Sequence, residues 1–457
     1  MSLVYLSFQR PPPHALVPNE ALRVCVNVTN DLRSEPYLPP TGAPLRLRLV
    51  WVDEKFKPIG GAPTAEHTWT DASSAYKVVD GLKAPSSLRG IDIIHLAICG
   101  VPPERRKNAA GPSVTPVRPG RIPITPAQHQ NTGVEDGYVF RLHADERSEG
   151  PEFVPVLSGP IRVSRHSSDL GKQNVLLRII RLGDRTLPIP SKCVDVVIQE
   201  HTGFDLDKHI WDASIHLLRL LTSSATSLPA SLRLLERARE QMQVSNQPFR
   251  IVELGAGTGI VSILLAKWLA SQINLEPEGQ ATSHGAVGAN ADSDDAIKPP
   301  LVSFYATDLE SALPIMNTNL DLNGCTPSNT SAQSYRHVGS DRVRFHAPVH
   351  LNWTDSALPG ELSQQTDLVL ISDCTYNSTF YKPLAQTLTR LSPRSCILAK
   401  KHRHEDEKVL WNIFGEEEQR DEHGTFQWVL VKGHSQDDSA SSGDCDWAVW
   451  ERRTVFK

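Results

Sequence analysis

The chain has 457 residues, of which 39% are hydrophobic, and carries a formal net charge of −5 at pH 7. This length and composition allow two or three folded domains, and the scattered basic residues disfavour a long phosphate backbone as partner. No stretch approaches the roughly 18 apolar residues of a membrane span, and no secretory leader is recognisable. The seven cysteines include no C-x-x-C pair and suit a reducing compartment. We therefore expect a cytoplasmic protein, with a nuclear location as the alternative.

The first 165 residues contain short apolar segments that are rich in β-branched residues and separated by Pro and Gly. Within 22–28 every second residue is Leu or Val, which is typical of a strand with one buried face. Residues 101 to 136 are predicted to be a mobile loop between two strands. The absence of a helical pattern predicts a β-rich accessory domain of the sandwich type, with strands at 4–8, 22–28, 45–51, 91–99, 138–142 and 153–163.

From residue 166 onward strands alternate with helical patterns. This alternation predicts an α/β fold with a doubly wound, mostly parallel sheet. The last two strands must be antiparallel, because no helix connects them. Residues 276 to 299, rich in Gly, Ala, Ser and Asp, are predicted to be a disordered insertion. The predicted strands are 175–182, 194–199, one beginning at 251, 301–307, 342–349, 367–373, 395–401, 425–432 and 446–455, and the predicted helices are one containing Trp211, then 260–272, 309–322, 379–391 and 405–418.

The stretch 249–264 reads as a short apolar strand, a turn with three glycines and the start of an amphipathic helix. Gly255, Gly257 and Gly259 allow positive φ and a close approach of the backbone to a ligand, and the helix start directs N–H groups and the positive end of its dipole over the turn. A dinucleotide site would need glycine in place of Ile260, and a P-loop would need Gly-Lys-Ser/Thr. The turn therefore predicts a cofactor site of another kind.

Further candidate residues stand where the later strands end. Asp308 closes the second strand of the sheet, where a carboxylate accepts hydrogen bonds from ribose hydroxyls; capping of the next helix is the structural alternative. Trp353 follows the third strand, and its indole would lie against adenine or belong to the core. The fourth strand ends at Ser372 and delivers Asp373 and Tyr376 to the edge where open α/β sheets bind ligands.

Six segments carry a resemblance to a known family. Through these segments, the region 170–457 resembles the seven-β-strand protein-lysine methyltransferases. These are class I enzymes that use S-adenosylmethionine and form methyltransferase family 16. The D-x-x-Y element is the most specific of the six. The sequence departs from the family at Cys374 and Thr375, where bulky apolar residues are common, and in its β-rich extension and long insertion. The segments are Trp211-Asp212-Ala213-Ser214, Glu253-Leu254-Gly255-Ala256-Gly257-Thr258-Gly259, Thr307-Asp308, Leu351-Asn352-Trp353, Asp373-Cys374-Thr375-Tyr376 and Lys400-Lys401-His402-Arg403-His404.

The resemblance implies a class I methyltransferase fold for residues 166–457, Rossmann-like with a seven-stranded sheet, and S-adenosylmethionine as cofactor. Glu253 and the glycine turn would hold the methionine part, Asp308 the ribose and Trp353 the adenine, while Trp211 would close over the site. As catalytic residues, Asp373 and Tyr376 would line the channel for the target. The implied cofactor-binding residues are Trp211, Glu253, Gly255, Ala256, Gly257, Gly259, Asp308, Trp353, Ser372 and Asp373.

The reaction needs the target amine in its neutral form. A lysine with a pKa near 10.4 must lose its proton, which at pH 7 costs about 4.6 kcal/mol. Burial against Tyr376 and Trp211 would lower that cost, whereas the Asp373 carboxylate would raise the pKa of the lysine while attracting its charged form. We therefore interpret Asp373 as a binding and orienting group. No metal is expected, because His402 and His404 have no cysteine partner nearby.

Our main hypothesis is a protein-lysine N-methyltransferase whose substrate is another protein, without membrane or nucleic-acid partners. The alternatives are a methyltransferase that acts on arginine, nucleic acid or a small amine, and a cofactor-binding scaffold without activity. The sequence lacks the Asn/Asp-Pro-Pro-Tyr turn of base methylation and the double-glutamate loop of arginine enzymes. The β-rich domain is expected to recruit substrate or to serve packing.

Overall fold

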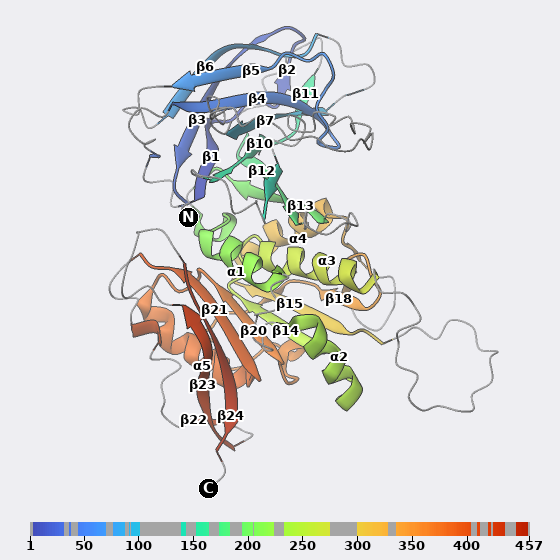
Figure 1. Ribbon diagram of the computed structural model, residues 1–457, viewed down its shortest axis with the longest axis vertical. Helices are drawn as coiled ribbons and strands as arrows, with labels where there is room; N and C mark the ends of the chain where they lie inside the picture. The colour runs from blue at the N-terminus through green and yellow to red at the C-terminus, as the bar shows by residue number, and fades with distance from the viewer. Residues whose placement is uncertain are drawn as a thin grey trace, which may run out of the picture. The chain divides into compact units, whose positions relative to one another are not determined.

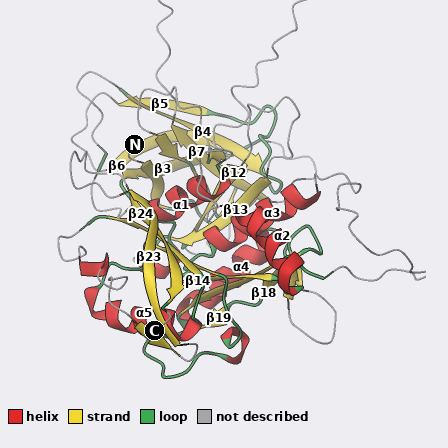
Figure 2. Ribbon diagram, turned by 60° about the horizontal axis from the view of Figure 1, so that its bottom comes forward, coloured by secondary structure: helices red, strands yellow, loops and turns green. Residues whose placement is uncertain are grey.

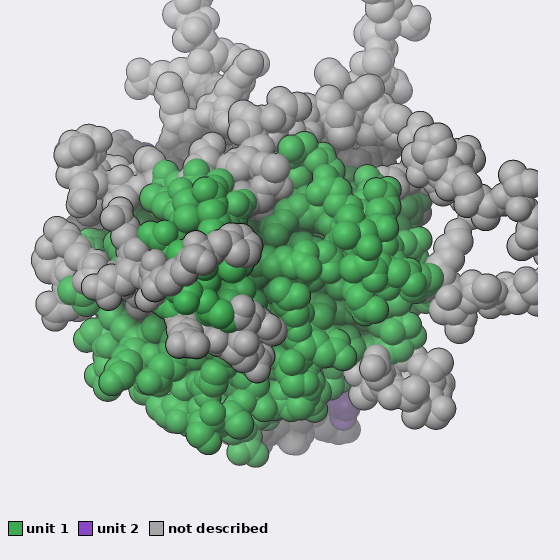
Figure 3. Space-filling view, turned by 90° about the horizontal axis from the view of Figure 1, so that it is seen from below, with its two compact units in different colours: residues 1–3, 141–148, 177–457 green, residues 4–140, 149–176 purple. Residues whose placement is uncertain are grey.

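The computed structural model divides the chain into two compact units. The N-terminal unit comprises residues 4–140 and 149–176, and the C-terminal unit comprises residues 1–3, 141–148 and 177–457, drawn in green in Figure 3. The domain boundary expected at 165–166 stays a prediction. The structure describes residues 3–31, 36–37, 44–69, 76–86, 91, 93–100, 139–142, 152–163, 173–182, 194–203, 205–223, 233–274, 299–327, 335–403, 409–411, 419–421, 424–434 and 445–455.

The N-terminal unit is built from strands, as the sequence predicts. One sheet has the order β6-β3-β1-β9, and in the other β7 lies between β4 and the strands β10 and β11. Both sheets contribute to one hydrophobic cluster, in which Leu6, Leu47 and Trp51 are fully buried. The strands are β1 (Leu3–Arg10), β2 (Ala15–Leu16), β3 (Ala21–Thr29), β4 (Leu45–Asp53), β5 (Ala65–Trp69), β6 (Tyr76–Lys83), β7 (Ile93–Gly100), β8 (Val139–Arg141), β9 (Glu152–Val154), β10 (Val156–Ser158) and β11 (Ile161–Val163).

The strand predicted at 153–163 is three strands in the structure. Pro155 separates β9 from β10, and Gly159 and Pro160 separate β10 from β11. Proline has no N–H to donate to a ladder, so it interrupts pairing where the apolar pattern alone predicts a continuous strand. The loop predicted at 101–136 lies outside the described residues.

The C-terminal unit contains a central sheet with the strand order β18-β15-β14-β20-β21-β24-β23. The first five strands pair in parallel, while β24 is antiparallel to both β21 and β23. The predicted seven-stranded arrangement, with one reversed strand at the end of the chain, is confirmed as the core of this sheet (Figure 1). In the described residues the whole sheet has eleven strands, because β16 (Thr326–Pro327), β17 (Tyr335–His337), β19 (Val349–His350) and β22 (Gln419–Asp421) extend it. The strands are β14 (Phe249–Leu254), β15 (Val302–Asp308), β18 (Val343–His346), β20 (Leu368–Ser372), β21 (Ser395–Lys401), β23 (Gly424–His434) and β24 (Cys445–Thr454).

Helices cover both faces of this sheet. Side chains of α5 (Tyr381–Leu391) pack with Val252, Val369 and Leu398 in one cluster, whereas α1 (Asp212–Thr222) and α3 (Ile260–Asn274) contact each other and are absent from that cluster. Figure 2 shows the helices around the sheet. Because successive strand residues point to opposite faces, the continuous apolar strands are those of a sheet buried on both sides.

Two asparagines of α4 (Leu313–Leu322 and its C-cap Asn323) hold the edge of β13 (Val194–His201). The Asn319 amide accepts from the N–H of Gln199 at 2.7 Å and donates to its carbonyl at 3.2 Å. Asn323 makes the same pair of bonds to Val197. Residues four apart on a helix and two apart on a strand have a similar spacing along one face. The two amides therefore make the hydrogen bonds to this edge of β13 that a neighbouring strand would otherwise make.

Several elements differ from the prediction. The strand expected at 342–349 is β18 followed by the separate β19 (Val349–His350), and α2 (Leu234–Ser245) was not predicted. The strands expected at 175–182 and 194–199 correspond to β12 (Val175–Leu182) and β13, which are neighbours in a sheet. Of the helix predicted at 405–418, only 409–411 is described, as a 3₁₀ turn, and the insertion predicted at 276–299 lies outside the described residues except for Pro299. In the described part of the chain, no helix has the length and apolar character that a membrane crossing requires.

Candidate functional site

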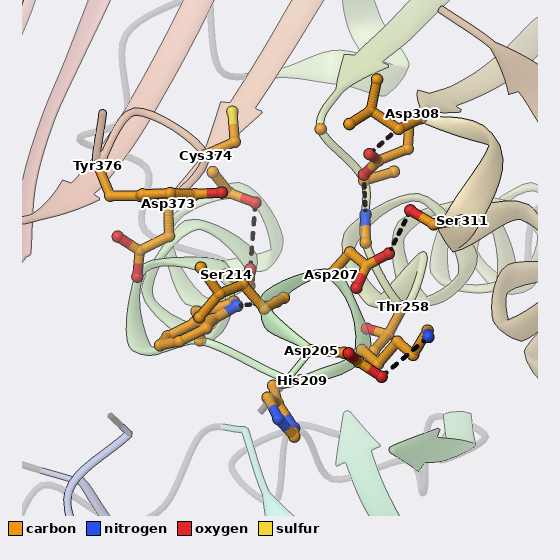
Figure 4. A pocket seen from close by; sticks show the side chains of 18 of the residues that line it. Asp205, Asp207, His209, Ser214, Thr258, Asp308, Ser311, Asp373, Cys374 and Tyr376 are labelled. Atoms are coloured by element: carbon orange, nitrogen blue, oxygen red, sulfur yellow. Dashed lines mark hydrogen bonds and ion pairs between the residues drawn. The ribbon is translucent and has the colours of Figure 1, made fainter. Parts of the chain in front are cut away.

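A cavity of about 440 Å³ opens at the carboxyl ends of β14, β15 and β20, where ligands bind in open α/β sheets. Figure 4 shows the acidic side chains Asp207, Asp308 and Asp373, which come from three different segments. The lining residues are Asp205, Leu206, Asp207, Lys208, His209, Trp211, Ser214, Gly255, Ala256, Gly257, Thr258, Ile260, Asp308, Leu309, Ser311, Leu351, Asn352, Trp353, Ser372, Asp373, Cys374, Tyr376, Asn377 and Phe380.

The glycine turn forms one wall of the cavity. Gly255 and Gly257 have φ angles of 68° and 54°. A Cβ on Gly255 would lie 2.6 Å from Cβ of Cys374, and one on Gly257 would lie 3.1 Å from the carbonyl oxygen of Asp207. Glycine is therefore required here by both the backbone conformation and the close approach of two other segments.

Asp308 fastens the glycine turn. Its carboxylate accepts from the N–H of Gly257 at 2.7 Å and from the N–H of Leu309 at 2.7 Å. Burial raises the pKa of Asp308, and the nearby Asp207 adds to this effect. The 3₁₀ helix that follows, Glu310–Ala312, has no side-chain cap, so the helix-capping alternative does not describe Asp308.

Glu253 lies beneath the turn and does not line the cavity. It is 1% exposed, and its Oε2 accepts from the N–H and hydroxyl of Ser262. Burial raises the pKa of Glu253 to about 7. Oε1 has no hydrogen-bond partner in the described residues. The predicted contact of this carboxylate with the cofactor thus stays a prediction, and its observed contacts support the turn.

A short segment, residues 205–211, covers the opposite side of the cavity. Asp207 accepts from the Ser311 hydroxyl at 2.7 Å, and the indole N–H of Trp211 donates to the carbonyl of Leu206 at 3.0 Å. The segment is anchored below by Glu200, which accepts from the N–H of Ile210 at 2.7 Å and is itself buried against Arg178. Sequence reasoning found only Trp211 in this segment.

Asp373 is held from three directions. Its φ of 53° is in the left-handed region, which Asp tolerates better than most residues. Arg403 donates to both carboxylate oxygens, at 2.5 and 2.9 Å, and the N–H groups of Lys401 and Ala213 approach at 3.2 and 3.5 Å. The guanidinium carbon of Arg403 also lies 5.3 Å from the centroid of the Trp211 ring. Arg403 thus connects two predicted site residues, although sequence reasoning assigned it no role of its own.

The residues after Asp373 complete the wall. The Cys374 thiol lies 3.3 Å from the carbonyl of Leu254, and burial raises its pKa well above the usual value, so it is a neutral wall group. Tyr376 and Phe380 line the cavity but remain 55% and 41% exposed. Burial raises the pKa of Tyr376, so this phenol keeps its proton at neutral pH. These two rings add partly exposed apolar surface to the cavity that also holds the acidic groups.

The structure brings most of the predicted site residues to one cavity. Glu253 and Gly259 are the exceptions, since neither lines it. Asp207, Ser311 and Arg403 are the interacting residues that sequence reasoning missed. Among the described residues, no three His, Cys, Asp or Glu side chains are grouped as a metal site would require. The predicted residues at the cavity are Trp211, Gly255, Ala256, Gly257, Asp308, Trp353, Ser372, Asp373 and Tyr376.

The strand order, the reversed β24 and a cavity over a glycine turn define a class I methyltransferase fold. Residues 191–276 and 282–416 match the family model described as lysine methyltransferase. The matched segments make up slightly less than half of the chain, which is thus similar to this family, methyltransferase family 16, whose cofactor is S-adenosylmethionine. No curated protein matches the chain significantly.

Solved structures with a similar fold are distant in sequence. A Nostoc punctiforme PCC 73102 protein assigned as an O-methyltransferase is 13% identical, with a TM-score of 0.25; the match covers 48% of this chain and 57% of that protein. Streptococcus pneumoniae Sp1610, assigned as a tRNA (m1A22) methyltransferase and solved with S-adenosyl-L-methionine, is 10% identical, with a TM-score of 0.26 and coverage of 49% and 74%. The chain therefore spans little more than half of the Nostoc protein.

The residues of the cavity fit the family's cofactor. At Gly255 and Gly257 the backbone itself lines the cavity without a side chain. Asp308 presents a carboxylate at the end of β15, the position that suits ribose hydroxyls. Trp353 lines the same cavity, and its ring approaches to 3.7 Å of a Cβ built on Gly255. The cavity thus offers a polar group and an aromatic face beside a backbone cradle.

Proposed function

We propose that this chain is an S-adenosylmethionine-dependent protein-lysine N-methyltransferase. The match to the family model supports the coarser statement, a methyltransferase that uses this cofactor. The lysine target is supported by the family's description and by the cavity lining, which combines the partly exposed rings of Tyr376 and Phe380 with the carboxylates of Asp205 and Asp207. An aliphatic stem with a basic end is complementary to such a surface.

The cofactor, when bound, supplies a methyl group on a positively charged sulfur. The lysine nitrogen forms a bond to the methyl carbon as the carbon–sulfur bond breaks, so the positive charge moves from sulfur to nitrogen, and the product ammonium then loses a proton to water. The chain's own contribution is to position the amine and exclude water, because an in-line displacement depends on alignment. Trp211, Tyr376 and Phe380 would provide this apolar environment.

The N-terminal unit is proposed to recruit the protein substrate. Its sheets form a separate hydrophobic cluster and contribute no residue to the lining of the cavity. The methyl-transfer site is therefore built entirely from the C-terminal unit, which leaves binding of a partner as the simplest task for the N-terminal one.

The first prediction concerns Gly255. Gly255→Ala would bring a Cβ within 2.6 Å of Cys374, so we expect cofactor affinity to fall by more than about tenfold and methyl transfer to be lost. Binding is measured by titration calorimetry with S-adenosylhomocysteine, and transfer by incubation of a cell extract with labelled S-adenosylmethionine. Mass spectrometry of the labelled product identifies the modified residue.

Gly324→Ala is the matched control for this variant. Gly324 has a φ of 66°, close to that of Gly255, but no atom lies within 4 Å of its Cβ position. It imposes the same backbone strain without the clash and should keep affinity and activity. Label on arginine or nucleic acid would refute the lysine target, whereas an intact wild-type chain that binds no cofactor would refute the enzyme class and favour a scaffold.

A further inference from the structure

Two ion pairs lie close together where the start of α1 meets the residue that follows β20. Asp373 pairs with Arg403 through two parallel hydrogen bonds, and Asp212 pairs with Lys401 at 2.6 Å. Within these pairs the Asp373, Arg403 and Asp212 side chains are 2%, 12% and 4% exposed. Buried charges in this geometry interact more strongly than exposed ones, because water screens them less.

Arg403 is placed to cancel a charge without entering the cavity. It is absent from the lining, while Asp373 is part of it. Its two N–H groups occupy both oxygens of Asp373, and its guanidinium lies over Trp211. One side chain therefore fixes the carboxylate and the aromatic ring that the sequence assigns to the same site.

Among the described residues, the other groups that face Asp373 offer it no second cationic side chain. Lys401 offers Asp373 its backbone N–H, whereas its ammonium binds Asp212. Cys374, the next residue, is neutral because burial raises its pKa, and Tyr376 keeps its proton for the same reason. The carboxylates of Asp308, Asp373 and Glu253 all act on Cys374, so loss of Arg403 would leave the charge of Asp373 uncompensated at this wall.

We propose that Arg403 is a positioning residue that neutralises Asp373 at the methyl-transfer cavity, so that this wall does not hold the target amine in its charged form. The inference rests on the proposed function, because it concerns how the site treats a lysine. An uncompensated carboxylate would stabilise the ammonium and raise the pKa of the lysine, which opposes formation of the nucleophile. The pair keeps the orienting contacts of Asp373 and removes that penalty.

The experiment uses the charge of the cofactor itself as the probe. S-adenosylmethionine carries a positive sulfonium and S-adenosylhomocysteine a neutral sulfur, so the ratio of their affinities reports the charge of the wall. In Arg403→Gln the ratio of the Kd of S-adenosylhomocysteine to that of S-adenosylmethionine should rise about tenfold. Arg403→Lys should return it towards the wild-type value. Both constants are measured by titration calorimetry on the full chain.

Asp373→Asn provides a second test, in which the ratio of the two Kd values should change in the opposite direction. Asn also tolerates the left-handed backbone, and the positive charge of Arg403, no longer balanced by the Asp373 carboxylate, would then repel the sulfonium, so the same ratio should fall about tenfold. The double variant should lie near wild type. A loss of folding lowers both affinities together and cannot produce opposite changes in their ratio.

Arg181→Gln is the matched control. Arg181 makes an equivalent forked pair with Asp195, at 2.7 and 2.8 Å, and neither residue lines the cavity. In Arg181→Gln, the ratio of the Kd of S-adenosylhomocysteine to that of S-adenosylmethionine should equal the wild-type ratio. Ratios within twofold of wild type in both Arg403→Gln and Asp373→Asn would overturn the inference. This readout needs no methyl acceptor, so it remains decisive even if the search for a methylated lysine fails.

Discussion

At the scale of single residues, Glu253 illustrates how a side chain can serve the site without touching the ligand. It lies at the end of β14, where the family resemblance implied contact with the cofactor. In the structure its carboxylate supports the start of α3 through Ser262, while the turn above it lines the cavity. The role of this residue therefore concerns the rigidity of the turn, and it leads to a prediction about stability.

Glu253→Gln should stabilise the protein at alkaline pH and not at acidic pH. Burial raises the pKa of the folded-state carboxyl from 4.5 to about 7, so the folded state binds the proton more tightly than the unfolded state. Stability from this group is complete below about pH 4.5 and is lost as pH rises through 7. Glutamine can accept the bonds from Ser262 and does not ionise, so the gain above pH 7 should be on the order of 3 kcal/mol.

Urea unfolding of both proteins at pH 5 and pH 8 measures this difference. The gain in unfolding free energy of Glu253→Gln over wild type should be larger at pH 8 than at pH 5, by most of the roughly 3 kcal/mol given above. An equal difference at both values would mean that Glu253 is ionised throughout and that the polar contacts of the turn outweigh its burial.

At the scale of secondary-structure elements, α4 binds the edge strand β13 through the side-chain amides of Asn319 and its C-cap Asn323. Asn319 is fully buried and also donates to the carbonyl of Thr258 in the glycine turn at 2.9 Å. Asn319→Ala would leave the N–H and carbonyl of Gln199 and the carbonyl of Thr258 without these bonds. Each buried polar group left unpaired costs about 1 to 3 kcal/mol, so we expect a loss of roughly 3 kcal/mol or more in unfolding free energy.

The same variant should expose a particular amide. Hydrogen exchange at Gln199 should accelerate in Asn319→Ala, while that at Val197, held by Asn323, should change less. Asn274→Ala is the control, since Asn274 is exposed and donates only to the carbonyl of Gly339 in the described residues. If Asn319→Ala were no less stable than Asn274→Ala, water would have to replace the amide bonds at this edge.

The elements also reveal which parts of the fold a sequence can specify. The apolar strands β14, β15, β20 and β21 were predicted within two residues, because strands buried on both faces and separated by helices leave a strong pattern. α2 was missed because only Leu234 and Ala238 are buried, so no apolar stripe marks it. β5 was missed because its residues are polar and half-exposed.

The residues of the site also differ in whether the sequence alone could identify them. The glycine turn and the strand ends could be found because their chemistry is written in adjacent residues and strand ends meet at one edge. The pairing of Asp373 with Arg403 joins residues 30 positions apart, and that of Asp207 with Ser311 joins residues 104 apart. Such contacts depend on how loops fold over the sheet, which no local pattern encodes.

On the scale of the whole molecule, the two units have separate hydrophobic cores and should respond separately to perturbation. Trp51 is completely buried in the N-terminal cluster, and its indole N–H donates to the carbonyl of Lys83 at 3.1 Å. Trp51→Ala should cost that unit about 3 to 5 kcal/mol. The cofactor cavity belongs to the other unit, so its affinity for S-adenosylhomocysteine should stay unchanged.

Scanning calorimetry with and without S-adenosylhomocysteine tests this independence. We expect two unfolding transitions, of which Trp51→Ala lowers one and the ligand raises the other, by about 2.7 kcal/mol at a hundredfold excess over Kd. If recruitment of substrate is the task of the N-terminal unit, the variant should also retain cofactor binding while losing methylation of protein. One transition that moves with both the substitution and the ligand would instead mean that the two cores unfold as a single cooperative body, in which case loss of protein methylation by Trp51→Ala would say nothing about recruitment.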